Sequence, residues 1–481
     1  MPARQRLPRA TPEDQGVSSR ALLALVDDLE RSTPEVHSLM VVRHGVVLAE
    51  GWWAPYAADR GHQLFSLSKS FTSAAVGLAL AGGLFTIDDL VLDHFPDEAP
   101  AQPGEHLSRM RVRDLLTMTA GHDTDPSDAV FAAPDWVRAF LAQPVEHAPG
   151  THFTYNTAAT YMLSALVQKA TGERLLDYLQ PRLLGPLGIT GATWECSPQG
   201  IDTGGFGLTI TTEDIACFGQ LLLDDGVWRG ERLLPAGWVA EATARQVSNG
   251  AEPANDWAQG YGYQFWRCRH DAYRADGAFG QFCVVLPDQQ VVVAITAAVA
   301  DMGAVLRALW THLLPAVADR PEAPDPVALD ALTTRLAGLR LDPPAGEPTS
   351  VAASGLSGRE IVFEPNALGI ASAVLVPGTD HDTVTVVGAD DGPQTIEAGH
   401  GVWRAGRVRA QARALSERSV LASAVWTAAD TYVLTVRESD GPLVLTATAT
   451  VTDDGITVAP SFHVSFGLTT LPTLTGRPAA P

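Results

Sequence analysis

The chain has 481 residues, which is too long for one ordinary domain, so two or three domains are expected. Hydrophobic residues make up 46% of the sequence and charged residues 18%, a balance typical of a globular protein with a sizeable core. The formal net charge of −22 argues against nucleic acid or an anionic membrane surface as a partner, because both bind basic patches.

The cysteines and the N-terminal segment further limit the class of protein. The four cysteines show neither a C-x-x-C motif nor a metal-ligand spacing, so they are expected to be reduced thiols. No apolar segment follows the basic residues 1–9, and no stretch is long and apolar enough to span a membrane. We therefore expect a cytoplasmic protein.

The first segments of the chain predict a helix and a hairpin. Ser18 is a suitable N-cap for an amphipathic helix over residues 19–31. Residues 38–43 and 46–50 are strand-like and flank His44-Gly45, which is typical of a β-hairpin turn.

Residues 65–83 carry the strongest chemical signal. The segment after residue 70 is small or apolar on almost every side and ends at Gly82-Gly83, which predicts a buried helix. Ser66 stands at its start and Lys69 lies one turn further on, close enough to touch Ser66. A buried lysine with a lowered pKa can remove the proton that keeps a serine hydroxyl from acting as a nucleophile. The alternative is a surface lysine beside a serine-rich cap, but the chain has only two lysines and this one stands among apolar residues.

The middle of the first part predicts helices and loops. A short helix from residue 112 runs into a polar segment at 117–122, and further helices are expected over 158–171 and 213–224. Tyr155 precedes the helix over 158–171, where a tyrosine can be either a core residue or a functional one. The glycine-rich turn at 204–208 has neither of the known phosphate-loop spacings.

Strands return near the end of this part. Residues 257–267 alternate and are rich in aromatic side chains, and residues 279–286 and 291–296 are two further strand candidates, followed by a helix over 302–314. This order predicts an α/β (α+β) fold, in which helices flank an antiparallel sheet whose strands come from both ends of the segment.

The character of the sequence changes after about residue 315. Two Pro-rich stretches enclose a short helix at 326–339, and strand-like segments spaced by about ten residues follow from residue 359 onward. These segments are 359–364, 371–376, 383–387, 420–427, 431–437, 442–451 and 455–458. We expect a domain over 1–315, a Pro-rich linker over 316–350 and an antiparallel β-barrel or sandwich over 351–481.

Four ordered segments together resemble the serine β-lactamase and penicillin-binding-protein superfamily. Ser66-Leu67-Ser68-Lys69 is similar to its S-x-x-K motif, and residues 115–121 are similar to its L-L-T-H-T-S-G stretch. Residues 149–157 are similar to P-G-x-x-F-x-Y-x-N, and residues 204–216 to G-G-G-L-x-S-T-x-x-D-x-A. The resemblance covers residues 10–315 and is nearest to the class C branch, which includes esterases, D-aminopeptidases and 6-aminohexanoate-dimer hydrolases. The β-rich part resembles the lipocalin-like domain that follows some members.

The resemblance implies a site and a mechanism. Ser66 is expected to attack a carbonyl, while Lys69 and Tyr155 share the base and acid work. The backbone N–H groups of Ser66 and Ala278 are expected to form the oxyanion hole. Asp276, Gly277, Asn156 and Thr157 complete the expected substrate-binding set.

Two departures from the family pattern bear on substrate choice. Thr157 stands where the family has asparagine, with Asn156 one place earlier, and Ala275-Asp276-Gly277 stands where it has K-T-G or H-x-G. Because an aspartate there repels a carboxylate, although Arg274 can offset it in part, penicillin hydrolysis and cell-wall trimming are disfavoured.

The sequence therefore predicts a cytoplasmic serine hydrolase that acts through an acyl-enzyme on a small ester or amide, without a metal or cofactor. A homo-oligomer is compatible with this prediction. The alternatives are an acyltransferase with the same site, a β-lactamase or D,D-peptidase, and a non-catalytic receptor that keeps the fold for ligand binding.

Overall fold

The computed structural model of the chain describes residues 7–388, 392–409, 417–452 and 455–479. The chain forms two compact units, one from Met1–Trp52 with Ala57–Leu339 and the other from Trp53–Tyr56 with Arg340–Pro481. The second unit therefore takes in four residues from the segment that precedes the Ser66 motif.

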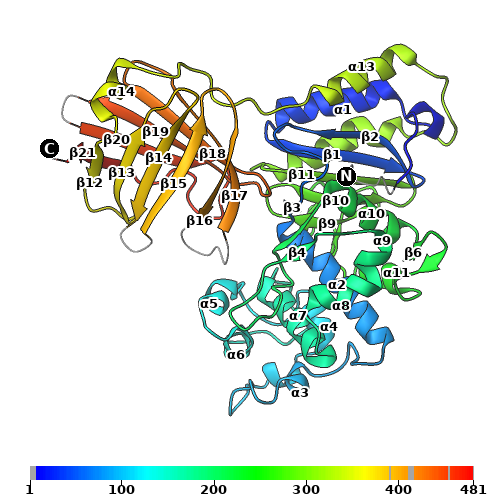
Figure 1. The fold of residues 1–481 in the computed structure, drawn as a ribbon. Coiled ribbons are helices and arrows are strands. Elements are labelled where there is room, and N and C mark those ends of the chain that lie inside the picture. Colours follow the sequence, from blue (N-terminus) through cyan, green and yellow to red (C-terminus); the bar gives the residue numbers. More distant parts are fainter. Residues whose placement is uncertain (1–6, 389–391, 410–416, 453–454, 480–481) are drawn as a thin grey trace. The chain divides into compact units, whose positions relative to one another are not determined.

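The first unit is built on an antiparallel sheet, as the sequence predicts (Figure 1). In the described part of the chain its strand order is β2-β1-β11-β10-β9-β8. The strands are β1 (Val36–Arg43), β2 (Val46–Trp52), β8 (Trp266–Arg267), β9 (Tyr273–Gly277), β10 (Gln281–Leu286) and β11 (Val291–Ala297). Because β1 pairs directly with β11, the two ends of the segment meet in the middle of the sheet.

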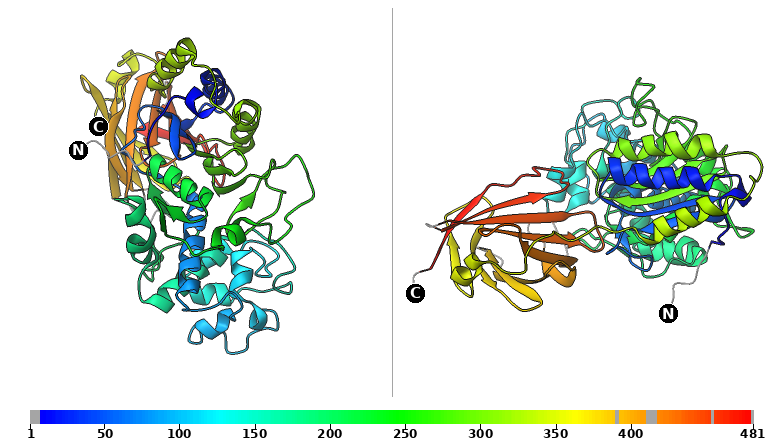
Figure 2. Two further views of the ribbon diagram at one scale, coloured as in Figure 1. Left: turned by 90° about the vertical axis from the view of Figure 1, so that its right-hand side faces the viewer. Right: turned by 90° about the horizontal axis from the view of Figure 1, so that it is seen from above.

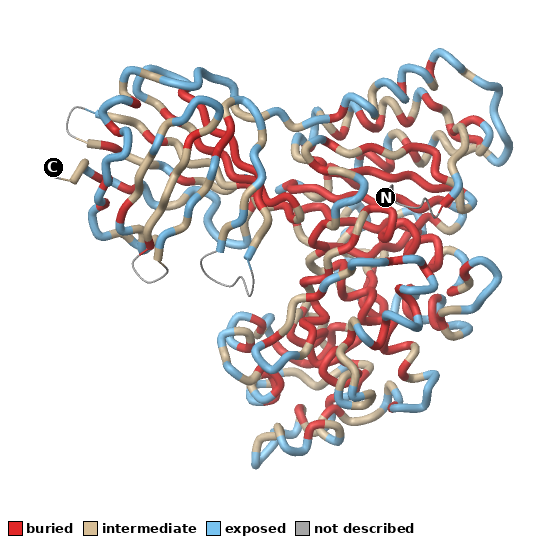
Figure 3. Tube along the Cα trace, in the orientation of Figure 1, coloured by how far each residue is buried: buried red, intermediate tan, exposed pale blue. Residues whose placement is uncertain are grey.

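Helices cover both faces of this sheet. On one face α1 (Ser19–Ser32) packs against α12 (Met302–Ala308) and α13 (Pro326–Ala337), and Figure 2 shows α1 between them when the molecule is seen from above. The N-cap of α1 is Ser18, as expected, and its side chain accepts a hydrogen bond from the N–H of Arg20. On the other face α10 (Thr212–Leu223) packs on β1, β10 and β11. Figure 3 shows the strands of the sheet as buried and much of the outer surface of α13 as exposed.

The position of α13 differs from the expected domain limits. Composition assigned this helix to a linker over 316–350, whereas the first unit extends to Leu339 and contains it. Leu332 and Ala328 are buried, and the Arg335 guanidinium pairs with Asp27 on α1 at 2.9 Å. Proline-rich flanking sequence resembles a linker, but the apolar face of this helix is used in packing.

A helical region inserted between β2 and β8 carries the Ser66 motif. Its two long helices, α2 (Ser68–Ala81) and α7 (Thr157–Thr171), pack against each other. The shorter helices are α3 (Val91–His94), α4 (Val112–Leu116), α5 (Ser127–Phe131), α6 (Trp136–Leu141), α8 (Leu175–Leu179), α9 (Gly185–Leu187) and α11 (Trp238–Thr243). The short strands are β3 (His62–Gln63), β4 (Thr193–Trp194), β5 (Leu208–Ile210), β6 (Val227–Trp228) and β7 (Glu231–Arg232).

The strand predicted over residues 257–267 is mostly wrong. Only Trp266–Arg267 is a strand, because Gly260 (φ +111°) and Gln264 (φ +68°) turn the backbone away from an extended path. The Gln264 amide donates hydrogen bonds to the carbonyls of Leu115 and Leu116 at the end of α4. This segment is therefore a folded loop that supplies hydrogen-bond donors to the unpaired carbonyls at the end of α4.

The second unit is a closed β-barrel. In its described residues the strand order is β15-β14-β13-β12-β21-β20-β19-β18-β17-β16, and β15 also pairs with β17. Nine strands thus close the barrel and β16 pairs alongside β17. The strands are β12 (Glu360–Phe363), β13 (Ile370–Val376), β14 (His381–Gly388), β15 (Gly392–Gly399), β16 (Arg404–Arg409), β17 (Glu417–Trp426), β18 (Thr431–Glu438), β19 (Val444–Thr452), β20 (Gly455–Phe462) and β21 (Leu474–Pro478). One short helix, α14 (Val351–Leu356), precedes them. The barrel alternative was therefore the right one of the two expected, while its likeness to lipocalins stays a prediction.

Among the described helices, none combines the length and apolar character that crossing a bilayer requires.

Candidate active site

Ser66 lies in a short 3₁₀ turn, Phe65–Leu67, directly before α2. The serine is half-buried, and the residue before it has a left-handed backbone (φ +48° at Phe65). A non-glycine residue in this region is strained, and such strain is common where a side chain must be presented at a site. The prediction that Ser66 stands at the start of a buried helix is confirmed in this local sense.

The other hydroxyls of the motif fix the start of α2. Ser68 Oγ accepts a hydrogen bond from the N–H of Leu208 at 3.1 Å. Ser70 Oγ donates to the carbonyl of Gln264 at 2.8 Å, and Thr72 Oγ1 donates to the carbonyl of Gly204 at 2.8 Å. These buried bonds tie α2 to two separate segments, the turn at 204–208 and the loop at Gln264, which explains why hydroxyl residues are frequent in this part of the helix.

Lys69 is brought into contact with Ser66 as the spacing predicts. Its side chain is buried, and its Nζ lies 3.0 Å from Ser66 Oγ. The same Nζ lies 3.2 Å from Thr157 Oγ1 and 2.8 Å from the carbonyl oxygen of Gly205. Among the described residues the three hydrogen-bond partners of Lys69 are all uncharged oxygens. The ammonium form is thus buried without a direct counter-charge.

Burial lowers the pKa of Lys69 from its usual 10.5 to about 7. The negative charges of Asp125 and Asp276 act in the opposite direction but are weaker than the loss of solvation. A large fraction of Lys69 is therefore neutral near neutral pH and able to accept a proton.

Tyr155 completes the cluster. Its ring centroid lies 5.0 Å from Lys69 Nζ, and its ring stacks on Trp266 with a centroid distance of 5.2 Å. Burial raises the pKa of Tyr155 well above its usual value of 10, although hydrogen bonds to Ser66 and Trp266 partly oppose that shift. The phenol is therefore protonated near neutral pH.

The two residues after Tyr155 have separate contacts. Thr157 Oγ1 reaches Lys69, so the residue at the family's asparagine position does contact the lysine. Asn156 is buried and caps α7 by accepting a hydrogen bond from the N–H of Ala159 at 2.9 Å. Its Nδ2 is 3.2 Å from His122 Nδ1. Both polar groups of Asn156 thus have structural partners, and its expected contact with substrate stays a prediction.

The end of β9 runs beside the Ser66 turn. A Cβ added to Gly277 would lie 2.0 Å from the carbonyl oxygen of Leu64, so only glycine allows this close approach. Ala278 follows in the turn between β9 and β10 and is half-buried. The strand therefore brings the backbone of Gly277 and Ala278 to the segment that carries Ser66, which is where the expected oxyanion hole would lie.

Asp276 is less available than the sequence suggested. It is buried, and its Oδ2 accepts a hydrogen bond from the Nε of Arg274 at 2.7 Å. Arg274 is fully buried and also lies over the ring of Trp257 at 4.4 Å. Burial raises the pKa of Asp276, whereas Arg274 and Lys69 act to lower it. The negative charge is thus paired within the protein, although it still acts on Lys69 and Tyr155.

Two groups were not predicted from the sequence. Asp125 is exposed, and its negative charge acts on both Lys69 and Tyr155. The Gly205 carbonyl accepts from Lys69 across 136 residues of sequence. A Cβ at Gly205 would lie 2.8 Å from Thr157 Cγ2, which explains the glycine there. The glycine-rich turn at 204–208 was visible in the sequence and contains Gly205. Asp125 is an isolated aspartate in a loop, and nothing in the sequence pointed to it.

Comparisons with known proteins bear on the family and the fold. The family model described as Beta-lactamase matches residues 26–318. Among curated relatives, 6-aminohexanoate-dimer hydrolase of Paenarthrobacter ureafaciens is 28% identical over 256 residues, covering 49% of this chain and 64% of its own length. D-aminopeptidase of Brucella anthropi is 27% identical over 160 residues, covering 31% of each chain. The chain thus spans less than two thirds of the length of the first relative and about a third of the second.

Solved structures share the fold at low sequence identity. The crystal structure of SurE is 18% identical with a TM-score of 0.51, and the match covers 95% of this chain and 99% of that one. EstCE1, a hydrolase with promiscuous acyltransferase activity, is 18% identical with a TM-score of 0.51, and covers 61% of this chain and 99% of its own. These likenesses show the fold alone. Since the family model covers more than half of the residues, the chain belongs to the β-lactamase family, within the serine hydrolase superfamily.

Proposed function

We propose that this protein hydrolyses a small amide or ester through an acyl-enzyme intermediate on Ser66. The observation that carries the proposal is the buried lysine, whose Nζ lies 3.0 Å from the serine hydroxyl and whose pKa is about 7. A neutral amine at this distance can take the hydroxyl proton as the serine attacks a carbonyl carbon.

The raised pKa of Tyr155 assigns its part in the reaction. A phenolate is disfavoured in this environment, so Lys69 acts as the base and the protonated Tyr155 acts as a relay. Tyr155 passes a proton toward the leaving group while Lys69 replaces it, and the leaving amine or alcohol departs neutral. Water then enters, and the same two groups reverse their roles to release the acid from Ser66.

The developing oxyanion needs donors that are already in place. We assign this role to the backbone N–H groups of Ser66 and Ala278. The support is the close approach of Gly277, the residue before Ala278, to the carbonyl oxygen of Leu64, two residues before the nucleophile.

The charge around the site favours an uncharged or cationic acyl donor. Asp125 and Asp276 both place negative potential on Lys69 and Tyr155, and Asp125 is exposed. An amine near the acyl group would be attracted and a carboxylate repelled. The names of the two relatives, a 6-aminohexanoate-dimer hydrolase and a D-aminopeptidase, describe amide substrates that carry an amine. We therefore expect amino-acid amides and ω-amino-acid oligomers to be hydrolysed and penicillins to be poor substrates.

Intact mass spectrometry tests the proposal directly. The wild-type protein and Ser66→Ala are incubated with a fluorophosphonate probe and with a panel of small esters and amides. The wild type should gain one covalent adduct, and Ser66→Ala should gain none. An equal adduct on both proteins, or a wild type that neither reacts with the probe nor hydrolyses any member of the panel, would overturn the assignment.

A further inference from the structure

We propose that Asp123, His147 and His152 form a binding site for one first-row transition-metal ion such as Zn²⁺ or Co²⁺. Each of the three side chains offers one ligand atom, and these atoms all lie within 4.8 Å of one another. Asp123 Oδ1 is 3.0 Å from His147 Nε2, and the two histidine rings stack with a centroid distance of 4.1 Å. None of the three is a hydrogen-bond partner of Lys69.

The spacing suits such an ion. Ligand atoms 2.0–2.1 Å from a tetrahedral zinc are separated by about 3.3 Å, and Asp123 Oδ1 and His147 Nε2 already lie 3.0 Å apart. The two imidazole planes are at 24° to each other, so one ring must rotate out of the stack for both rings to face the same ion. Two imidazoles and one carboxylate favour zinc, cobalt, nickel or copper over magnesium or calcium, which prefer oxygen ligands. Three protein ligands leave a position for water or another small ligand.

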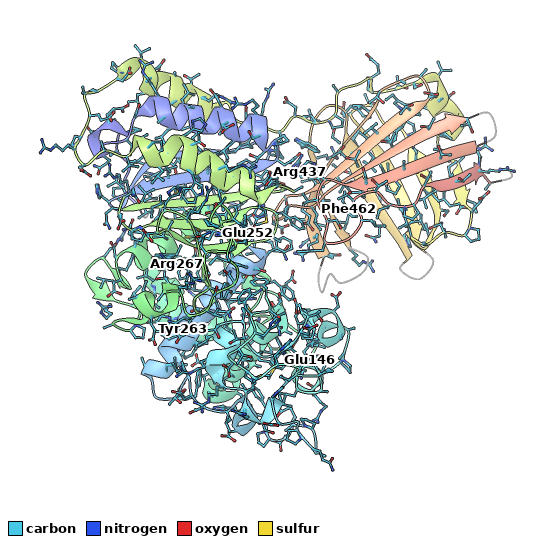
Figure 4. The ribbon with its side chains drawn as sticks, turned by 180° about the vertical axis from the view of Figure 1, so that it is seen from behind. Glu146, Glu252, Tyr263, Arg267, Arg437 and Phe462 are labelled. Atoms are coloured by element: carbon cyan, nitrogen blue, oxygen red, sulfur yellow. The ribbon has the colours of Figure 1, made fainter. Side chains whose placement is uncertain are left out.

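The backbone around the three ligands is already held in place. The N–H of His147 donates to the carbonyl of Gly121 at 2.9 Å, and a Cβ at Gly121 would lie 2.4 Å from the carbonyl oxygen of His147. Glu146, which Figure 4 labels in the helical region, accepts a hydrogen bond from the N–H of Asp123 at 3.1 Å. The two loops thus meet before any ion binds, which lowers the ordering cost of binding.

The accessibility of the ligands allows an ion to enter. Asp123 is exposed and both histidines are half-buried. Across the loop, Thr154 Oγ1 donates to the carbonyl of His122 at 2.8 Å, so the segment that bears His152 and leads into Tyr155 also contacts the segment that bears Asp123. A bound ion would join these two segments, and its first effect would be to stabilise them.

Metal titration of the tag-free, EDTA-treated full chain tests the proposal. Co²⁺ binding is followed by visible absorption and Zn²⁺ binding by calorimetry, with His147→Ala, His152→Ala and Asp123→Asn as variants. His463→Ala serves as the matched control, because it removes an exposed histidine from the second unit and none of the three ligands.

We expect one equivalent of ion per wild-type chain and per His463→Ala chain, with binding weakened at least 10-fold in each ligand variant. Zn²⁺ should raise the melting temperature of the wild type and of the control, but not that of the ligand variants. Melting curves recorded without metal show whether each variant is folded. If a histidine variant is unfolded, Asp123→Asn replaces it in the test, because asparagine keeps the shape of the aspartate side chain. No stoichiometric binding by the wild type, or equal binding by folded ligand variants, would overturn the proposal. These readouts do not use hydrolysis. The experiment can therefore reject the metal site without rejecting the proposed hydrolase function, and a failure of the proposed function would leave the metal site untouched.

Discussion

The two lysines of the chain lie in opposite surroundings. Lys69, at the start of α2, is buried against two hydroxyls and a carbonyl. Lys169, near the end of α7, is 38% exposed, and its Nζ lies 2.9 Å from a carboxylate oxygen of Glu98. One cation is stabilised by water and a carboxylate, while the other has lost its water and gained no direct counter-charge.

This difference separates a structural lysine from a chemical one. An ammonium group needs three hydrogen-bond acceptors, and Lys69 has three neutral ones that satisfy its geometry but do not balance its charge. A surface ion pair such as that of Lys169 is worth little and is readily replaced. Changes at the first site should therefore affect turnover, and equivalent changes at the second should not.

The largest effect on turnover is expected from a substitution of Ser66, the hydroxyl partner of Lys69. Ser66→Ala should lower the turnover of p-nitrophenyl acetate or butyrate by about 10³-fold or more, because the nucleophile is lost. The melting temperature should change little, since Ser66 is only half-buried. A variant that keeps more than about a tenth of wild-type turnover would show that another residue attacks.

The lysine pair itself provides a matched comparison. Arginine stays charged at any pH of interest, so Lys69→Arg should lose activity as fully as Lys69→Ala, by about 10²- to 10⁴-fold. Lys169→Arg keeps its surface charge and should retain wild-type turnover. An active Lys69→Arg protein would mean that this lysine supplies only positive charge.

Stability should also depend on Lys69 in a defined direction. The unfolded chain holds this proton up to pH 10.5, whereas the folded chain releases it near pH 7. Between these values the unfolded state binds more protons, so the free energy of unfolding should rise with pH, by up to about 5 kcal/mol from this group. Denaturant unfolding of the wild type and of Lys69→Met at pH 7 and pH 9.5 measures this change in the free energy of unfolding. If the free energy of unfolding changes equally with pH in both proteins, the assigned pKa is contradicted.

A smaller effect is expected from the exposed charge near the site. Because Asp276 is held by Arg274, Asp276→Lys would bury two cations together, and Asp125→Asn is the cleaner probe of charge preference. It should reduce the preference for a cationic over a neutral acyl donor by about 2- to 5-fold, a typical size for one exposed charge. Asp288→Asn, in the turn at the other end of β10, should leave the ratio of the two kcat/KM values unchanged. An unchanged ratio in Asp125→Asn would remove Asp125 from the account of specificity.

Local spacing explains how much of the site could be predicted. Ser66 and Lys69 are one helical turn apart, so their contact follows from the sequence alone, whereas Tyr155 needed the ordered family motifs. The contact of Lys69 with Gly205 and the effect of Asp125 on the pKa of Lys69 depend on tertiary packing. No periodicity or residue spacing in a single sequence indicates such long-range contacts. The Arg274–Asp276 pair was noted as adjacent, but its burial depends on the rings around it.

The fold shows the same division between local and long-range information. Apolar strands such as β11 and amphipathic helices such as α1 were predicted because their patterns are periodic. β15 and β16 were missed because their sequences are rich in glycine, proline or charge, which are rare in strands. They are held by pairing with β14 and β17.

The pH dependence of Ser66 labelling tests the central claim most directly. The rate of fluorophosphonate addition is measured from pH 5 to pH 10, with peptide mapping to confirm that Ser66 carries the adduct. If burial makes Lys69 the base, the rate should rise with pH to a plateau with a midpoint near 7, as the lowered pKa requires. A midpoint near the usual lysine value of 10.5, or a rate that does not change with pH, would show that Lys69 does not deprotonate the nucleophile.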